Sequence, residues 1–562
     1  MPAFAFDWNY TPFQSPFTPI LDTTVSRFVT SDMATGRGAL FDRWSYQEAT
    51  LEMPTAVASM FRGDFYNRFH VSALVFTLGN LVGNQVRELR VWNAFRRARV
   101  LEDLELIDGE GITVGGQPNP PLQFAPLQER VYSLEISTDG PPSVDAKLVF
   151  DLDEGESITI AITGSRVTPW VWRPDWSQEM AESLEWRTEI IESENDSEQA
   201  ISMRLAPRRS IGFGVGAELQ ERQAMETATA GWGGRVWSVP LWFDGADLTS
   251  ALPIGSTLVS VPTEGRDFYE GGLAMFMGQG WRDYEVVEVA TVYAGQVELR
   301  RPTVRAWPSG SVLYPARTAR MDPAGTTFGR FTGRMSSGRV NFDLVGPCDW
   351  PELTGLPTYR GLPVLEDIPE WSSEPTLLLA RKLGILDNGI SKPDVIDRAD
   401  VPLLRQAHKW SAVGRAQLAR LRSLAYLLKG RWGAIWVPSW VEDFTLAAQA
   451  PQTGSALDVN WQGYTLYLNG ARNRRDVRIA NAQGVQYARI ASSTELDAST
   501  ERLGLDTPLV RTYEPADTVV SYLTLWRLDT DRLEWSWWSG DMGGDYASAD
   551  VSMPMRTFRH DL

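Results

Sequence analysis

The residues that could carry out catalysis are few and widely separated in this sequence. The three histidines, His70, His408 and His560, are far apart, and none has the spacing of a metal site. Cys348 is the only cysteine, which excludes a zinc or iron–sulfur site with thiolate ligands within one chain. The 71 acidic residues could supply the two carboxylates of a glycosidase, but no pair stands out. We therefore expect no enzyme, no bound metal and no cofactor.

Nucleotide-binding and hydrolase motifs are also absent. No Walker loop, Rossmann glycine fingerprint, His-Glu-x-x-His or Gly-x-Ser-x-Gly motif occurs, and the glycines at 212–216 lack the spacing of a phosphate-binding loop. The formal charge of −18, from 53 basic and 71 acidic residues, repels nucleic acid and anionic lipid. We expect no sequence-specific binding of nucleic acid, although an acidic wall would let DNA slide past.

Targeting signals are equally scarce. No stretch approaches 18 uncharged apolar residues, so we expect no insertion into a membrane. Residues 1–8 lack a basic region followed by an apolar run, which predicts that there is no signal peptide. These features indicate synthesis in a cytoplasm.

The elements that must position any site are predicted to be mainly β-strands, in a mainly β (α+β) fold. The 47 glycines and 34 prolines are spread along the chain, as expected for many short strands joined by turns. Residues 157–162 alternate polar and apolar side chains, the pattern of a half-buried strand. Short strands at near-regular spacing predict an N-terminal β-sandwich domain over 1–165.

A tryptophan-rich stretch occurs twice, at 231–242 and at 430–440. Both copies end in Val-Pro-x-Trp, and after a polar interval each is followed by Gly-Ser-x-Leu. The two prolines, Pro240 and Pro438, stand 198 positions apart, and the other landmarks keep nearly the same offset. A shared offset indicates an internal duplication; the alternative is coincidence in a chain with 23 tryptophans.

The duplication predicts two related β-rich modules with one helix each: module 1 at 166–345 and module 2 at 346–562. The first helix is expected over 219–230 with Gly231 as its cap, and the second before Gly430. The second helix has one apolar stripe with basic residues on other faces: Leu418, Leu421, Ala425 and Leu428, against Arg415, Arg420, Arg422 and Lys429. At the C-terminus, a hairpin-like pair is predicted between 523–528 and 535–538, followed by an extended arm over 553–562.

The repeated stretch supplies the candidate assembly contacts. Aromatic residues and arginine are enriched at subunit interfaces, and the candidates are Trp237, Pro240, Trp242, Trp436, Pro438, Trp440, Arg204, Arg208 and Arg209. The alternative for the tryptophans and prolines is that they fill the core of each module. For the arginines it is a solvated face instead of pairing with acidic residues of a neighbour.

A leucine- and arginine-rich helix followed by Gly-Arg-Trp-Gly-Ala-Ile-Trp-Val-Pro-Ser-Trp resembles the tail-tip proteins of long, non-contractile-tailed bacteriophages. Glu198-Gln199, Arg204 and Pro207-Arg208-Arg209 are similar to a run of the same proteins. By character the chain looks like a distal tail protein of the upper baseplate. It departs from the family by carrying two copies where the simple form carries one.

The resemblance implies a structural virion protein at the tail tip, made in a host cytoplasm. Such a protein forms a ring that joins the tail tube to the hub and fibres and lines a DNA conduit. Its expected partners are further copies of itself, three or six per ring, the tail tube protein, the baseplate hub and fibre proteins, and the tape measure protein. The alternatives are a receptor- or glycan-binding tail protein and a polysaccharide-cleaving tail enzyme.

Overall fold

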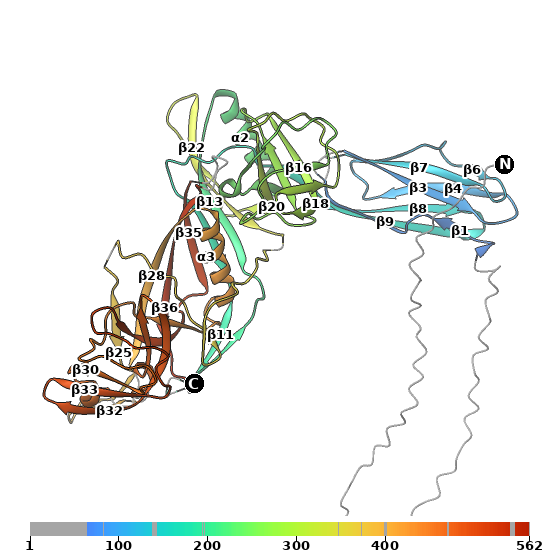
Figure 1. Cartoon of the computed structure of the whole chain (residues 1–562). Helices are drawn as coiled ribbons and strands as arrows, with labels where there is room; N and C mark the ends of the chain where they lie inside the picture. Colours follow the sequence, from blue (N-terminus) through green and yellow to red (C-terminus); the bar gives the residue numbers. More distant parts are fainter. Residues whose placement is uncertain are drawn as a thin grey trace, which may run out of the picture. The chain divides into compact units, whose positions relative to one another are not determined.

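The computed structural model describes residues 65–560 except 82–83, 138–142, 194, 196, 347, 373, 398–401, 469–470 and 540–545. The predicted fold class is confirmed, because strands in several sheets dominate and helices are few (Figure 1). Two predictions concern residues 1–64, which lie outside the described residues. They are the start of the N-terminal domain and the absence of a signal peptide.

Residues 65–169 form two facing sheets with a core between them. One sheet has the order β1 (Phe69–Val71), β3 (Gln85–Asn93), β7 (Glu129–Ile136), β5 (Ile112–Gly115). The other contains β2 (Val75–Leu81), β4 (Arg99–Ile107), β6 (Leu122–Phe124), β8 (Ser143–Leu152) and β9 (Ser157–Pro169). The core residues Leu89, Leu134 and Phe150 have no exposed side-chain surface. Strand β9 runs past position 165, because residues 167–169 pair with the next domain.

Module 1 consists of strands around one helix with a small β-domain inserted. Its frame is β10 (Met180–Glu185), the hairpin β11 (Thr188–Glu192) and β12 (Glu198–Ser202), β13 (Arg208–Glu218), α2 (Leu219–Trp232), β14 (Val236–Pro240), β20 (Val312–Met321), β21 (Thr327–Arg330) and β22 (Met335–Leu344). The insertion holds β15 (Ala246–Asp247), β16 (Leu258–Ser260), β17 (Leu273–Met277), β18 (Tyr284–Tyr293) and β19 (Gln296–Leu299). The insertion has its own apolar core.

Module 2 repeats this order after the short strands β23 (Thr358–Tyr359) and β24 (Leu362–Pro363). Its frame is β25 (Leu377–Ala380), the hairpin β26 (Leu383–Leu386) and β27 (Asp394–Asp397), β28 (Leu403–Val413), α3 (Arg415–Leu428), β29 (Ile435–Pro438), β34 (Val519–Leu528), β35 (Arg532–Ser539) and β36 (Ser548–Thr557). Its insertion holds β30 (Ala456–Asn460), the short helix α4 (Tyr464–Tyr467), β31 (Asp476–Asn481), β32 (Gly484–Asp497) and β33 (Thr500–Leu505).

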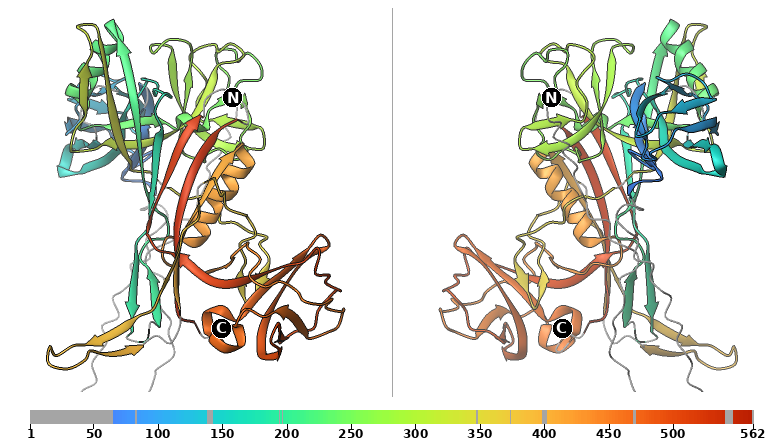
Figure 2. Two further views of the ribbon diagram at one scale, coloured as in Figure 1. Left: turned by 90° about the vertical axis from the view of Figure 1, so that its left-hand side faces the viewer. Right: turned by 90° about the vertical axis from the view of Figure 1, so that its right-hand side faces the viewer.

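The strand pairing of the two modules also repeats. Strand β13 lies between β10 and β22, and β28 lies between β25 and β36. Strand β14 pairs with β20 as β29 pairs with β34. The register is conserved as well, since Glu185 faces Arg208 and Ala380 faces Leu403, each residue 195 positions further on. Figure 2 shows the two hairpins, β11–β12 in teal and β26–β27 in yellow-orange. The duplication inferred from the sequence therefore has a counterpart in topology and register.

The predictions for the buried face of α3 and for the end of α2 had different outcomes. The stripe on α3 is confirmed, since Leu418, Leu421, Ala425 and Leu428 are all buried. The αL turn lies at Lys429 and Gly430, with φ of 50° and 68°. Gly231 does not cap α2, which continues to Trp232 and ends at Gly233 in the right-handed region. Three closely spaced glycines leave that stop undetermined by sequence.

The predicted C-terminal hairpin is wrong. Strands β34 and β35 do not pair with each other; each pairs with β36, and β35 also pairs with β10 of module 1. Residues 548–557, part of which was expected to be an arm, form a strand between β28 and β35. Turn residues at 529–531 predict a reversal of the chain, but only the rest of the sheet decides which strand lies alongside.

A buried histidine in module 2 leads to a pH prediction. His408 on β28 lies among Trp410, Trp440 and Trp526, and burial lowers its pKa from 6.5 to about 4. The unfolded chain therefore takes up this proton at a higher pH than the folded protein does. Stability should be fully present above pH 6.5 and fall by about 3 kcal/mol as the pH drops towards 4. Urea unfolding at several pH values measures this loss, and His408→Phe should flatten the profile in the same window. An equally steep profile in His408→Phe would contradict the assignment.

Candidate assembly interface

The two modules join through one pair of strands. Strand β10 of module 1 pairs antiparallel with β35 of module 2, over Met180–Glu185 and Arg532–Trp537. This pairing produces a continuous run of eight strands within a larger sheet, in the order β21–β22–β13–β10–β35–β36–β28–β25. Strands β22 and β36 also pair with β20 and β34. Each module contributes four strands in the same internal order. The contact is therefore an edge-to-edge continuation of the sheet, held by main-chain hydrogen bonds.

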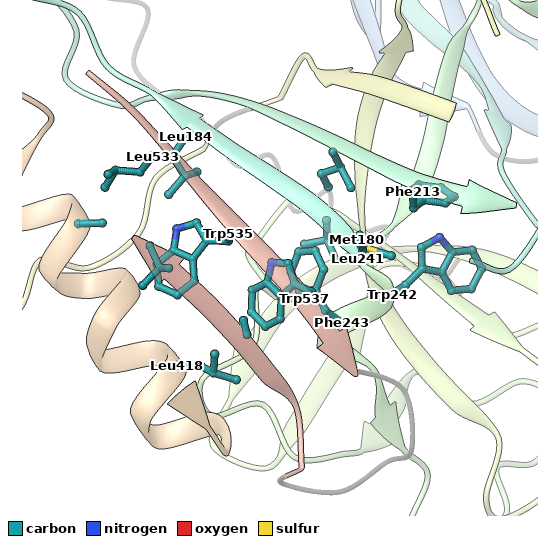
Figure 3. Close-up of a cluster of buried hydrophobic side chains, with 14 of the residues drawn as sticks. Met180, Leu184, Phe213, Leu241, Trp242, Phe243, Leu418, Leu533, Trp535 and Trp537 are labelled. Carbon is teal, nitrogen blue, oxygen red and sulfur yellow. The ribbon is translucent and has the colours of Figure 1, made fainter. Parts of the chain in front are cut away.

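Apolar side chains from both modules fill the space between this sheet and α3 (Figure 3). Met180 and Leu184 from β10 lie beside Trp535 and Trp537 from β35, and all four are buried. Phe243 of module 1 stacks on Trp537 with ring centroids 4.1 Å apart and planes 9° apart. Stacked aromatic pairs contribute about 0.5–1.5 kcal/mol beyond their buried area. This packing excludes water from the strand pair.

A carboxylate without exposed surface lies within the apolar layer. Glu182 on β10 accepts hydrogen bonds from Arg209 Nε at 2.5 Å and from Arg422 Nη2 at 2.7 Å. It also accepts one from Trp537 Nε1 at 2.9 Å. Arg209 belongs to module 1, whereas Arg422 and Trp537 belong to module 2. Because a buried charge is tolerated only with partners, Glu182 ties the two modules together by its own need for donors.

Two further carboxylates extend the cluster. Asp244 of module 1 accepts a hydrogen bond from Arg415 Nη1 of α3 at 2.5 Å. Asp267 accepts from both Arg209 and Arg317. Burial opposes ionisation of Asp267, but the charges of Arg209, Arg317 and Arg422 outweigh it and hold its pKa below the ordinary value. The cluster alternates acids and bases, so each buried charge has an opposite neighbour.

The predicted tryptophans and prolines lie mostly in the cores. Trp237, Trp242 and Trp436 are buried, as are Pro240 and Pro438 at the ends of their strands. Trp237 contacts Trp170, Trp242 contacts Tyr314, and Trp436 contacts Tyr359, as ring pairs at 5.5, 5.1 and 5.2 Å. Burial within one chain favours the core alternative for these five residues. Trp440 differs, since its side chain is only half-buried.

The three predicted arginines have different surroundings. Arg204 is half-buried and donates to the carbonyl of Glu185 at 3.1 Å. Arg208 is exposed on the face of β13 that points away from the core. Arg209 is buried in the cluster with Glu182 and Asp267, so its pairing lies inside the chain and not with a neighbouring copy as predicted.

The acidic partners of the cluster were not predicted, and two arginines of α3 lie elsewhere than predicted. Arg415 and Arg422, expected away from the apolar stripe, are buried against module 1. Their spacing of seven, with Leu418 between them, places both on one face two turns apart. That spacing was the available signal. Nothing in the local sequence marks Glu182, whose partner Arg422 lies 240 positions away.

The described residues contain no group of three or more His, Cys, Asp or Glu able to hold a metal ion. None of the helices among them is long and apolar enough to cross a membrane. No model of a known protein family matches the chain, and no curated protein matches it.

The cluster predicts a large cost for losing its central carboxylate. Glu182→Ala leaves Arg209 and Arg422 buried without a shared partner, and we expect a loss of about 3–5 kcal/mol in unfolding free energy. Glu534→Ala, on the neighbouring strand at an exposed position, should change it by less than about 1 kcal/mol. Urea unfolding followed by tryptophan fluorescence compares the two. Similar small losses in both variants would show that Glu182 does not hold the modules together.

Proposed function

We propose that this chain is a structural virion protein of a phage tail tip, which assembles into a ring and contributes its modules to a wall around a DNA conduit. The observation that supports this most directly is the pair of strands at the two ends of the eight-strand run. Among the described residues, β25 pairs only with β28, and β21 pairs only with β22.

These two end strands are the counterparts of the strands that join inside the chain. Strand β25 occupies in module 2 the place that β10 occupies in module 1, and β21 occupies the place of β35. One chain therefore carries one completed module contact and the two halves of a second one. An open sheet edge invites pairing with another chain, and closure around an axis satisfies every edge at once.

The two helices differ in burial in the way that a missing neighbour would produce. Eight residues of α3 are buried, whereas only Met225 of α2 is. Helix α3 is covered in part by module 1, through contacts such as those of Arg415 and Arg422. Helix α2 has no module in that position within the chain. A preceding module from another copy would cover it.

Three copies would account for these features and would match a sixfold partner. Three chains, each with two modules, would place six modules around the axis. Their three runs of eight strands would close a barrel of 24 strands. Six modules match a sixfold tail tube, which is the partner that the resemblance to distal tail proteins implies. Six copies with twelve modules in two layers remain the alternative arrangement.

The face of the sheet that points away from the helices suits a conduit. Many of its side chains are small or polar, and they include charges of both signs, for example the Lys409–Asp550 pair at 3.3 Å. The exposed apolar residues on the same face are Met335, Leu378, Val413 and Trp538. The residues on this face include Ser210, Gly216, Ser337, Asn341, Ala407, Ser411 and Ser552, with Arg208, Arg339, Arg405, Asp343 and Glu534. The expected acidic wall is thus replaced by a mixed one. A face with charges of both signs would let a polyanion pass with few strong contacts.

In the particle, the ring would lie between the tail tube protein and the baseplate hub and fibre proteins, around the tape measure protein. The localisation that follows is the virion, at the tail tip. No catalytic role, cofactor or sequence-specific DNA binding is part of the proposal.

The mass of the purified protein in solution tests the ring. Three chains of 62.8 kDa give about 188 kDa, measured by native mass spectrometry or light scattering at micromolar concentration. Leu378→Lys places a charge on the open edge of β25 and should shift the population towards monomer. Ile254→Lys, at an exposed apolar position in the insertion of module 1, is the matched control and should leave the mass unchanged. A wild-type protein that stays monomeric contradicts the proposal, and a six-chain mass supports the two-layer ring.

A further inference from the structure

We infer that β25 of one copy pairs antiparallel with β21 of the next copy, in the register that β10 and β35 use within the chain. This inference rests on the proposed ring and specifies its contact residue by residue.

The place of β25 follows from its pairing with β28. Ser183 on β10 faces Ser210, and Leu378 on β25 faces Arg405. Both members of the second pair lie 195 positions after those of the first. Leu378 therefore occupies in module 2 the place of Ser183 in module 1.

The place of β21 follows in the same way through the neighbouring strands. Val215 on β13 and Phe328 on β21 face the same residue of β22, which lies between the two strands. In module 2, Trp410 on β28 and Trp535 on β35 face the same residue of β36. Trp410 lies 195 positions after Val215. Phe328 therefore occupies in module 1 the place of Trp535 in module 2.

Combining the two correspondences fixes the register between copies. Within the chain, Ser183 of β10 faces Glu534 of β35, one residue before Trp535. Its counterpart between copies is Leu378 facing Thr327. In the same register Leu377 faces Phe328, with both side chains on the helix side of the sheet. A slip by one residue would turn Leu377 away from that side.

The surfaces that would meet are apolar at both ends of the sheet. Leu378 and Leu379 on β25 are 53% and 63% exposed. Val441 lies 198 positions after Phe243, the offset between Pro240 and Pro438, and is 43% exposed. At the other end, Leu219 at the start of α2 and Phe331 after β21 are 53% and 72% exposed. Phe243 lies where module 1 meets the start of α3, since its carbonyl accepts from Arg415 Nη2. Val441 is therefore expected near the start of α2, where Leu219 is exposed.

Charges at the hairpins agree with the same arrangement. Within the chain, Lys382 of module 2 forms an ion pair with Glu192 of the β11–β12 hairpin in module 1. The residue 195 positions before Lys382 is Arg187, and the residue 195 positions after Glu192 is Asp387. Both are exposed, and each keeps the sign of its counterpart. Asp387 of one copy should therefore meet Arg187 of the next.

Paired cysteines test the register directly. Trp186 N donates to Asp531 O at 2.8 Å, so by alternation Ser183 and Glu534 form a non-hydrogen-bonded pair, in which side chains lie closest. The double variant Leu378→Cys with Thr327→Cys should therefore form a disulfide between copies under mild oxidation. Non-reducing denaturing electrophoresis should show a covalent species of three chains. Cys348, the only native cysteine, is buried, and each single variant reports its background.

The matched control keeps Leu378→Cys and moves the second cysteine by one residue, to Phe328→Cys. Because Phe328 points to the opposite face, this pair should cross-link at least about fivefold less. Equal cross-linking of both pairs, or a ladder of species longer than three chains, overturns the inferred register or the closed contact. A three-chain mass without cross-linking overturns the register alone and leaves the ring intact. A monomeric mass without cross-linking overturns both.

A charge exchange provides a second test at exposed positions, where the fold is not at risk. Asp387→Arg should weaken assembly, because it places two arginines together, and the apparent dissociation constant should rise about two- to fivefold. Adding Arg187→Asp should restore the original value. If the double variant is as weak as the single one, the two residues do not meet across the contact.

Discussion

The contact between β10 and β35 is the constraint on which the rest of the molecule depends. It joins the four-strand sheets of two modules into one sheet and places α3 against strands of module 1. Main-chain hydrogen bonds fix the direction of the contact, and the buried carboxylate of Glu182 fixes its register through donors from both modules. A slip by one residue would break the ladder, expose the apolar layer and leave charges unpaired. The two modules therefore have one arrangement.

The two modules share a topology but not a surface chemistry, and the difference has a physical reason. The contact inside the chain never separates, so it can bury ionised groups whose desolvation is offset once, during folding. Strand β25, at one free end, carries Leu377, Leu378 and Leu379 instead. This suits the contact between copies that we propose, because such a contact gains from burying apolar surface without stripping charges of water. Leu377 stands where Glu182 stands in module 1, and Phe328 stands where Trp535 stands in module 2. The two modules share the strand order of the frame, whereas the residues at its edges differ.

Much of the fold could be predicted because periodicity and spacing are local properties. The stripe from Leu418 to Leu428 determines that α3 is a helix and which side of it is buried. The offset of 198 between Pro240 and Pro438 indicated a repeat that extends to the register of the strands. The candidate site was harder to predict. Most of the repeated tryptophans lie in cores, and the residues that join the modules include Glu182 and Arg422, which no local pattern connects.

The sequence by itself determined the β-rich class, the duplication, the position of α3 and the lack of a recognisable catalytic motif, because each depends on residue type and near spacing. Only the tertiary structure decided that β36 lies between β28 and β35, that Arg209 and Arg422 share one carboxylate, and that among the described residues β21 and β25 each pair along one edge alone. Pairing between strands depends on which distant segments bury the same surface, and the free energy of that choice is distributed over the whole chain. Local pattern therefore specifies the helices and strands, and the packing of the whole chain specifies which strands lie side by side.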